Sequence, residues 1–500
     1  MLKSFIIKKL AARRKKAIEK WSNKPVISQE NTLKKLIKSG QKTLFGKDHN
    51  FSQIKTYEDY KKNIPVVDYE GIKPYINKII QGDRNVLWPG RPAYFAVTSG
   101  TTSGAKYIPI TKESIPNLMG GAKDALFIYI ANTGNTDVLS GKHIFLQGSP
   151  ILEKKGGIKT GRLSGISVHH YPFFLKLTRL PSHKTNCIVD WEEKVDKIVE
   201  ETIKEDMRIL SGIPSWLQMY FEKLQEKAKI PVGEIFENFN LLIYGGVSYA
   251  PYKKKFEKLI GRKIDSIEVY PASEGFFAFQ DNQDANDLLL ILNSGIFYEF
   301  VSEKDYLEKK QNRLSLKDVK EGVNYVLIIS TNAGLWAYNT GDTIMFTSTK
   351  PYRIIVTGRI KQFLSAFGEH VIVKEVETAI QEACLETGTI INEFTVAPQF
   401  GTDTTMSCHQ WFIDFETPPT SLKDFEKLLD KKLQKQNKYY KDLVEGSVIA
   451  PLKIERVLNK SFNFYMKSIG KFGGQNKIPK LSNDRIIAEK LYKLDLVKKP

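Results

Sequence analysis

Hydrophobic residues recur at helical spacing up to about residue 85. Leu33 and Leu36 are three positions apart, as are Tyr57 and Tyr60 further along the chain. Residues three or four apart share one face of a helix, so each pair can face a common core. The pattern predicts that the chain begins with a series of helices.

The pattern changes after residue 92. Residues 93–97 (Ala-Tyr-Phe-Ala-Val) form a short apolar run that leads into a Gly/Ser/Thr-rich stretch over 98–104. A run of this length followed by glycines is typical of a strand that enters a flexible loop. Residues 111–131 have the spacing of a helix.

Short apolar runs alternate with helical segments in the middle of the chain. The runs are Ile209-Leu210, Leu241–Tyr244 before Gly245-Gly246, Ile264–Val269 and Tyr325–Ser330. This alternation predicts a parallel α/β sheet. Two further runs, Leu288–Leu292 and Ile296–Val301, are separated by Asn-Ser-Gly and predict a hairpin.

The pattern of apolar and polar positions changes again after Arg359. Helical patterns cover 372–384, 421–437 and 482–493, and strand patterns lie near 392–397, 408–415 and 447–454. These elements suffice for a small α+β domain. We predict one domain over 1–358, a second over 359–500, and a hinge near Gly358-Arg359-Ile360-Lys361.

Composition and charge narrow the classes of function. The 500 residues are 41% hydrophobic and 26% charged, with a formal net charge of +19. Basic residues attract anions, but these are scattered, and no basic run is interleaved with stacking aromatic residues. We therefore expect no nucleic acid as the main partner.

Cysteine content and hydropathy bear on the compartment. Cys187, Cys384 and Cys408 are far apart and lack the spacing of a disulfide framework or a zinc site. Such usage fits a reducing cytoplasm, which is the localisation we expect. No apolar stretch approaches the roughly 18 residues of a membrane-spanning helix.

The first residues form a basic amphipathic pattern. Its apolar positions are Leu2, Phe5, Ile6 and Leu10, opposite Lys8, Lys9, Arg13 and Arg14. We expect an ordinary helix docked on the protein. Peripheral contact with a membrane is the alternative.

The first motif with chemical potential is the stretch Thr98–Lys106. Its glycines let backbone N–H groups approach phosphate oxygens, and its hydroxyls and Lys106 add donors and positive charge. It lacks the GxxxxGK[ST] pattern of a P-loop. Taken alone, it could equally be an ordinary loop.

The second motif is Tyr270-Pro271-Ala272-Ser273-Glu274, at the end of a predicted strand. Ligands of open parallel sheets bind beyond the carboxyl ends of strands. There, an aromatic ring can cover a purine, a hydroxyl can reach a phosphate, and a carboxylate can hold Mg²⁺. The alternative is a turn whose serine caps a helix.

Two further motifs complete the series. Tyr338-Asn339-Thr340-Gly341-Asp342 places a carboxylate after a glycine, where it could accept hydrogen bonds from a ribose diol; alone it suits a hairpin turn. Arg359, followed later by Gly368-Glu369, could contact a nucleotide phosphate or be a surface arginine in a linker.

The order of the four motifs resembles that of the adenylate-forming superfamily. More narrowly, the chain resembles the auxin-responsive acyl-acid amido synthetases, which have bacterial members, and we expect a bacterial-type member. The resemblance covers about residues 60–485. It rests on Ile64–Ile76, Ser99–Lys106, Tyr270–Glu274, Tyr338–Asp342 and Gln475–Lys480. Asn339 and Lys480 depart from it, because the family usually has arginine at both places.

The resemblance implies a fold: a large N-terminal α/β domain with mixed sheets and a small, mobile C-terminal α+β lid. It also implies two cofactors, ATP and Mg²⁺, and a set of roles. The residues implied to bind ATP or AMP are Ser99, Gly100, Thr101, Thr102, Lys106, Tyr270, Ser273, Glu274 and Asp342. Glu274 is also the implied metal ligand, and Lys477 and Arg359 are the implied catalytic residues, with Lys471 competing with Lys477.

The implied activity is that of an ATP-dependent ligase. A small carboxylic acid would be activated as an acyl-adenylate and joined to an amino acid, with AMP and pyrophosphate as products. An acyl-CoA synthetase and a non-catalytic adenylate-binding protein remain alternatives. The sequence does not identify the acid or the amine, although we expect segments near 162–171 and 212–220 to line the acid's pocket.

Overall fold

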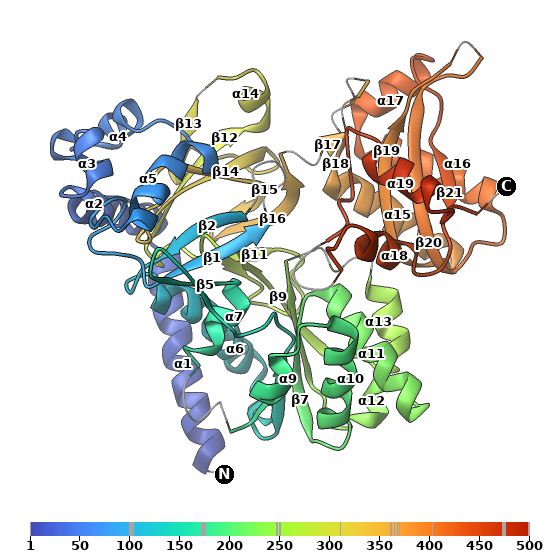
Figure 1. Ribbon diagram of the computed structural model, residues 1–500, viewed down its shortest axis with the longest axis horizontal. Helices are drawn as coiled ribbons and strands as arrows, with labels where there is room; N and C mark the ends of the chain where they lie inside the picture. Colours follow the sequence, from blue (N-terminus) through green and yellow to red (C-terminus); the bar gives the residue numbers. More distant parts are fainter. Residues whose placement is uncertain are drawn as a thin grey trace. The chain divides into compact units, whose positions relative to one another are not determined.

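The computed structural model separates into two compact units, which are described one at a time below (Figure 1). The first comprises Met1–Val247 and Lys263–Val356, and the second Ser248–Arg262 and Thr357–Pro500. The residues that the structure describes are 2–99, 105–171, 177–246, 249, 252–310, 312–360, 363–364, 366–367, 369, 371–402, 404–472 and 477–498.

The first unit begins with helices, as the sequence predicted. They are α1 (Leu2–Ser22), α2 (Pro25–Gly40), α3 (Leu44–Asp48), η1 (Phe51–Gln53), α4 (Tyr57–Asn63) and α5 (Tyr69–Gln81). Local chemistry sets their starts: Thr56 and Asp59 form a reciprocal capping box on α4, and Asp68 caps α5. Helix α1 is docked as expected, but through Ala11, Ile18 and Trp21.

A four-stranded sheet follows, in the order β2-β1-β5-β4. Its strands are β1 (Tyr94–Ser99), β2 (Ala105–Ile110), β4 (Glu153–Lys155) and β5 (Ile158–Gly161). The predicted strand at 93–97 is confirmed, but the sequence pattern missed β2, which precedes helix α6 (Ile115–Thr133). A strand pair therefore flanks the hydroxyl-rich stretch.

The large sheet of this unit has the order β13-β12-β14-β15-β16-β11-β10-β9-β8-β7-β3-β6. Its strands are β3 (Lys142–Phe145), β6 (Arg179–Leu180), β7 (Met207–Gly212), β8 (Leu241–Gly245), β9 (Asp265–Pro271), β10 (Phe276–Phe279), β11 (Leu288–Leu290), β12 (Ile296–Ser302), β13 (Arg313–Leu314), β14 (Asn324–Thr331), β15 (Tyr338–Thr349) and β16 (Tyr352–Arg359). Strands β6, β3, β7, β8 and β9 pair in parallel, which confirms the predicted parallel part.

The predicted hairpin over Leu288–Val301 is wrong. Strand β11 pairs with β10 and β16, whereas β12 pairs with β13 and β14. Gly295, at φ +71°, turns the chain between the two strands without pairing them. The strands therefore lie at separate places in one mixed sheet.

The remaining helices of this unit connect the strands. They are η2 (Asp137–Leu139), α7 (Leu163–Val168), α9 (His183–Asn186), α10 (Trp191–Thr202), α11 (Pro214–Ala228), α12 (Val232–Ile235), α14 (Glu303–Leu307) and η4 (Leu316–Asp318). Helices α10 and α11 run side by side, and α11 packs on β7 (Figure 1).

The second unit is a small α+β assembly. Its elements are α13 (Lys253–Ile260), β17 (Phe363–Leu364), β18 (Val371–Ile372), α15 (Val373–Thr387), β19 (Ile390–Gln399), β20 (Cys408–Thr417), α16 (Leu422–Gln436), α17 (Lys438–Glu445), β21 (Lys453–Arg456), α18 (Ser461–Ser468) and α19 (Ile486–Lys493). Strands β19, β20 and β21 form a sheet whose buried face packs on α15 and α16. The predicted elements are confirmed, with β21 and α19 starting later than expected.

Helix α13 is the unexpected member of this second unit. It lies between β8 and β9 in the sequence, yet Lys254 Nζ donates to the Cys384 carbonyl at 2.5 Å and Lys258 Nζ pairs with Glu416 at 3.0 Å.

None of the described helices is long and apolar enough to span a bilayer.

Candidate functional site

The carboxyl ends of three parallel strands lie together in the first unit. Gly212 of β7 is in register with Tyr244 of β8, and Gly245 of β8 with Val269 of β9. Ligands of α/β sheets bind at such edges. The second sequence motif follows directly from β9 and is placed at this edge.

That motif forms a tight turn between antiparallel strands and does not begin a helix. The Ala272 N–H donates to the Gly275 carbonyl at 2.7 Å, and the Gly275 N–H donates back at 3.3 Å. Strand β10 then returns along β9, with Phe276 opposite Pro271. The turn presents Ser273 and Glu274, both half-buried, at the strand ends.

Tyr270 and Asp342 meet although they are far apart in the sequence. The Tyr270 hydroxyl donates to Asp342 Oδ2 at 2.6 Å, and each residue is only 7% exposed. The Tyr270 ring packs edge-on against Phe277. A short bond to an ionised acceptor fixes both groups in orientation.

Asp342 is presented by a bulge and not by the hairpin turn that its local sequence suits. Strands β14 and β15 pair Ile328 with Asn339 and Val326 with Thr343, so residues 340–342 lie opposite Leu327 alone. Gly341, at φ +80°, permits this course. Bulges commonly re-aim a side chain next to a site, and this one carries Asp342.

Asn339 stabilises the same bulge. Its Oδ1 accepts from the Gly341 N–H at 2.8 Å, and its Nδ2 donates to the Tyr306 hydroxyl at 3.1 Å. Asn339 is only 9% exposed, and its bonds stabilise the bulge that presents Asp342.

The segment 64–76 braces two of the motifs, because it forms hydrogen bonds next to both the third motif and the first. The Val67 N–H donates to the Ala337 carbonyl at 3.2 Å, and the Asn339 N–H donates to the Val67 carbonyl at 2.8 Å. Two residues later, the Tyr69 hydroxyl accepts from the Tyr107 N–H at 2.9 Å. Nothing in the sequence pattern pointed to Val67 or Tyr69 in this role.

Lys106 lies beside this brace. It is opposite Thr98 in the β1–β2 pair, and its Nζ is 5.6 Å from the centroid of the Tyr69 ring. Ser99 is opposite Ala105, but Gly100, Thr101 and Thr102 lie outside the described residues. The flanking strands are paired, which differs from the strand–loop–helix of a P-loop.

Gly245 is a further residue whose identity the packing requires. A Cβ there would lie 2.2 Å from the Val269 carbonyl oxygen. The backbones of β8 and β9 therefore approach closely just before the Tyr270 turn. In the sequence, only the pair Gly245-Gly246 pointed to this approach, and glycine pairs are common to many loops.

The second unit carries Arg359 and Glu369. Arg359 is exposed at the end of β16, after Gly358 at φ +149°, while Lys361 and Gly368 lie outside the described residues. Burial opposes ionisation of Glu369, but the hydrogen bond from His409 Nε2 at 2.8 Å holds its pKa below the usual value. Glu369 also accepts from the Phe367 N–H, so it orders the chain beyond β17.

The two candidate lysines are both exposed. Lys471 follows Gly470, and Lys477 is the first described residue after the gap at 473–476. Just beyond it, the Val396 N–H donates to the Lys480 carbonyl at 2.9 Å, and the Thr395 hydroxyl donates to the Pro479 carbonyl at 2.6 Å. The segment carrying Lys477 is therefore attached to β19 on its C-terminal side.

Lys480 is an anchor within that attachment. Only 7% of it is exposed; its Nζ pairs with Glu393 and lies 4.7 Å from the Phe394 ring centroid and 5.7 Å from that of Tyr252. The ammonium of Lys480 is therefore engaged within the second unit.

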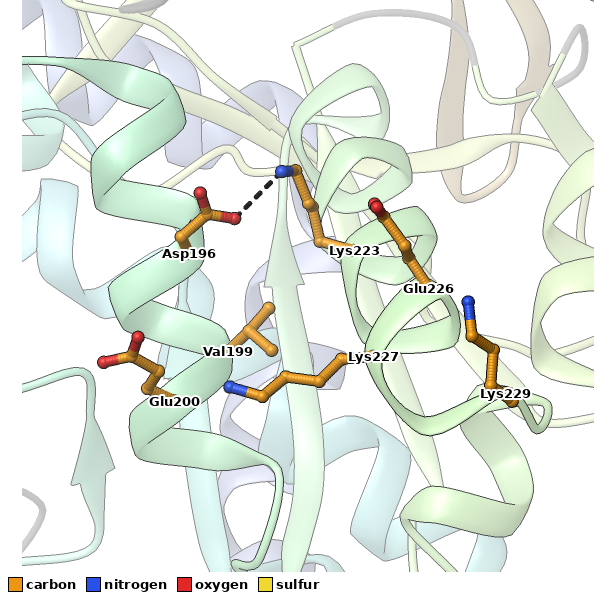
Figure 2. A pocket seen from close by; sticks show the side chains of 7 residues that line it. All are labelled: Asp196, Val199, Glu200, Lys223, Glu226, Lys227 and Lys229. Carbon is orange, nitrogen blue, oxygen red and sulfur yellow. Dashed lines mark ion pairs between the residues drawn. The ribbon is translucent and has the colours of Figure 1, made fainter.

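A hollow of about 410 Å³ lies between α10 and α11, and none of the motif residues lines it (Figure 2). Its lining residues are Asp196, Val199, Glu200, Lys223, Glu226, Lys227 and Lys229. Acids and bases balance, and Lys223 pairs with Asp196 at 3.0 Å. Such a surface suits solvent-exposed helices and not a nucleotide.

Within the described residues, no three acidic, histidine or cysteine side chains group into a metal site made of protein alone. The candidate site therefore consists of the Tyr270–Asp342 pair, the adjoining Ser273–Glu274 turn and the braced β1–β2 pair.

Three domain models of one protein family match most of the chain. Residues 14–264 match the GH3 family N-terminal domain, 289–359 the GH3 family central domain and 374–486 the GH3 family C-terminal domain. The first match alone covers more than half of the chain.

Similar curated proteins are plant enzymes. An indole-3-acetic acid-amido synthetase of Arabidopsis thaliana is 22% identical, over 93% of this chain and 90% of its own length. A jasmonoyl–L-amino acid synthetase of Nicotiana attenuata is 23% identical over 63% of this chain, which spans 66% of that relative.

Solved structures share the fold. The structure of the GH3.15 acyl acid amido synthetase superposes with a TM-score of 0.79 at 15% identity, covering 97% of this chain and 96% of the other. A 2-hydroxyisobutyryl-CoA ligase superposes with a TM-score of 0.54 at 12% identity, covering 97% and 90%. The predicted fold class, a large part with mixed sheets and a small α+β part, is confirmed.

Proposed function

This chain belongs to the GH3 family of acyl acid amido synthetases, which are ATP-dependent adenylate-forming ligases, and we propose how its own residues perform that reaction. In the first step, a carboxylate oxygen attacks the α-phosphorus of ATP, the bond to the β-phosphate oxygen breaks, and pyrophosphate leaves. In the second, an amino acid's amine attacks the acyl carbon, loses a proton, and AMP leaves.

The observation that carries the proposal is the buried Tyr270–Asp342 hydrogen bond at the edge of the sheet. We assign the ribose to Asp342 and the adenine to the Tyr270 ring. An ionised acceptor held at a bulge is suited to a diol, because both hydroxyls can donate to one carboxylate.

The triphosphate is assigned to the β1–β2 connection. We propose that Ser99, Gly100, Thr101 and Thr102 hold the β- and γ-phosphates, with Lys106 supplying positive charge. Ser273, on the turn after β9, is assigned to the α-phosphate. Catalysis then consists of positioning and charge neutralisation, which need no Ser-His-Asp arrangement.

Glu274 is the proposed Mg²⁺ ligand. Mg²⁺ is usually bound by one or two carboxylates together with substrate phosphates and water, so a single well-placed glutamate fits. Its position on the two-bond turn beside Ser273 supports this assignment. The ion would offset negative charge on the phosphates.

The second unit supplies the proposed catalytic cations. Arg359 is assigned to a phosphate, and Lys477 to the charge that develops during transfer at the α-phosphate, with Lys471 as the competitor. We propose that this unit rotates about a junction near residue 359, so that different residues serve the two steps. A crosslink between the units should then abolish turnover and leave ATP binding intact; undiminished turnover would refute rotation.

The remaining partners are assigned more coarsely. We propose that the segments 162–171 and 212–220 line the pocket of the acid. We further propose a bacterial-type member of the family, and three free cysteines support a cytoplasmic protein. A phylogenetic placement among plant sequences would refute the former, and localisation outside the cytoplasm the latter.

A pyrophosphate-release screen tests the function. The purified chain is given ATP, Mg²⁺ and a panel of carboxylic acids, first alone and then with each amino acid or with CoA. We expect release to depend on the acid, and an amide product with an amino acid. A thioester with CoA and no amide would favour a CoA ligase, and no release with any acid would favour an adenylate-binding protein without turnover.

A further inference from the structure

Helix α1 exposes the apolar residues that its sequence pattern predicts for the docked face. Leu2 is 74% exposed, Phe5 56%, Ile6 48% and Leu10 49%. The helix instead docks through Ala11, Ile18 and Trp21. Several neighbouring exposed apolar side chains on one helix mark a surface that another partner can cover.

The docked side of α1 is firmly held. Arg14 forms two hydrogen bonds with Asp124 of α6, at 2.5 and 2.6 Å, and Lys15 donates to Asn132 at 2.8 Å. Near the start of the helix, Ser4 bonds to Thr136 at 2.7 Å. These bonds at Ser4, Arg14 and Lys15 determine which side of α1 faces outward.

The outward side is strongly basic. The residues of α1 include one acid, Glu19, and eight bases: Lys3, Lys8, Lys9, Arg13, Arg14, Lys15, Lys16 and Lys20. Lys9, Arg13, Lys16 and Lys20 are all exposed and follow one another at helical spacing. Among the residues that the structure describes, no carboxylate forms a salt bridge with any of these four. The row therefore carries like charges that no ion pair neutralises among the described residues.

We propose that this outer face of α1 binds the surface of an anionic lipid bilayer. The apolar residues of the first turns would enter the interface, and the basic row behind them would meet acidic headgroups. Charge complementarity selects an anionic partner, and the exposed phenylalanine, leucines and isoleucine select one with an apolar interior. A nucleic acid backbone would use the cations but not this cluster.

The test uses the full chain and vesicle flotation. The wild-type protein should bind phosphatidylcholine vesicles that contain phosphatidylglycerol and should not bind phosphatidylcholine alone. The triple variant R13E/K16E/K20E should lower the fraction bound to the anionic vesicles by at least about tenfold. The variant F5S/I6S should also bind less, and most clearly at high salt, where the electrostatic attraction is screened. All five substituted residues lie outside the proposed active site, so pyrophosphate release should be unchanged.

Helix α16 offers a matched control. Lys423, Lys427 and Lys431 are exposed at helical spacing, without exposed apolar neighbours on that helix. K423E/K427E/K431E changes the net charge as much as the α1 variant does and should retain binding. Equal loss in both triple variants, or no binding by the wild type, would overturn the proposal. So would binding of a labelled RNA duplex, lost in R13E/K16E/K20E, without any vesicle binding.

Discussion

Asp342 and Lys477 are both proposed to act on the nucleotide, yet they are presented in opposite ways. Asp342 is buried, oriented by the Tyr270 hydroxyl and carried on a bulge that Asn339 stabilises. Lys477 is exposed, and the residues that follow it are attached to β19. One group is buried and oriented before the ligand arrives, whereas the other lies at the protein surface.

The contrast matches two different tasks. A group that binds the substrate equally in the ground state and the transition state lowers KM, and it gains from being pre-organised. A cation needed only while charge develops raises kcat, and it serves best when it is delivered at that step. Substitutions at the two residues should therefore change different kinetic parameters.

The largest effect should come from Asp342→Ala. It removes an ionised acceptor for two ribose hydroxyls and leaves the Tyr270 hydroxyl without this partner. Hydrogen bonds to charged groups contribute about 1.5–3 kcal/mol each, so kcat/KM for ATP should fall roughly a thousandfold, chiefly through KM. Steady-state kinetics with varied ATP, and calorimetric titration of ATP, measure it.

Tyr270→Phe sharpens the same point, because it keeps the ring and removes only the hydroxyl that orients Asp342. We expect a rise in the KM for ATP of about tenfold. An unchanged KM in Asp342→Ala would exclude Asp342 from the nucleotide site.

Lys477→Ala should change the other parameter. Loss of a cation that acts only during transfer should lower kcat roughly a hundredfold and leave the KM for ATP nearly unchanged. Lys471→Ala is the matched control, since Lys471 is equally exposed in the same unit. If kcat falls in Lys471→Ala and not in Lys477→Ala, Lys471 is the catalytic cation in place of Lys477.

Lys480 tests whether the attachment of the Lys477 segment is structural. Lys480→Met leaves Glu393 without its cation in a mostly buried place, so the free energy of unfolding should fall by about 2 kcal/mol. Lys480→Arg, which keeps a cation beside Glu393, should retain most of the stability. Chemical denaturation measures both. A Lys480→Met variant of normal stability with a raised KM for ATP would instead indicate contact with the nucleotide.

The sequence predicted helices and strands well where hydrophobic periodicity alone indicates them. It predicted them poorly where they depend on which strands pair with one another. The helices up to Gln81 and the strands β7, β8 and β9 follow from periodicity. Strand β2 was missed because its register depends on β1, and the hairpin at 288–301 was wrong because its strands pair with distant partners.

The candidate site shows the same division. The motifs located Tyr270 and Asp342, but the bulge that joins them depends on the pairing of β14 and β15, which local sequence does not specify. Val67 and Tyr69 act through backbone hydrogen bonds, and almost any residue at position 67 could provide those of Val67. Their contribution becomes visible only when the strands they brace are in place.

The smallest predicted effect tests that brace. Tyr69→Phe keeps the ring beside Lys106 and removes the hydroxyl that accepts from the Tyr107 N–H. Loss of one neutral hydrogen bond costs about 1 kcal/mol, so we expect the KM for ATP to rise about fivefold with little change in kcat. The control lies on the same helix: Tyr75 donates to Asp48 at 3.0 Å, away from β2 and β15, so Tyr75→Phe should leave the KM for ATP unchanged. An equal rise in both variants would show that α5 acts through general stability, and no rise in Tyr69→Phe would show that β2 holds Lys106 unaided. A rise confined to Tyr69→Phe would place this tyrosine among the pre-organising contacts that Asp342 exemplifies.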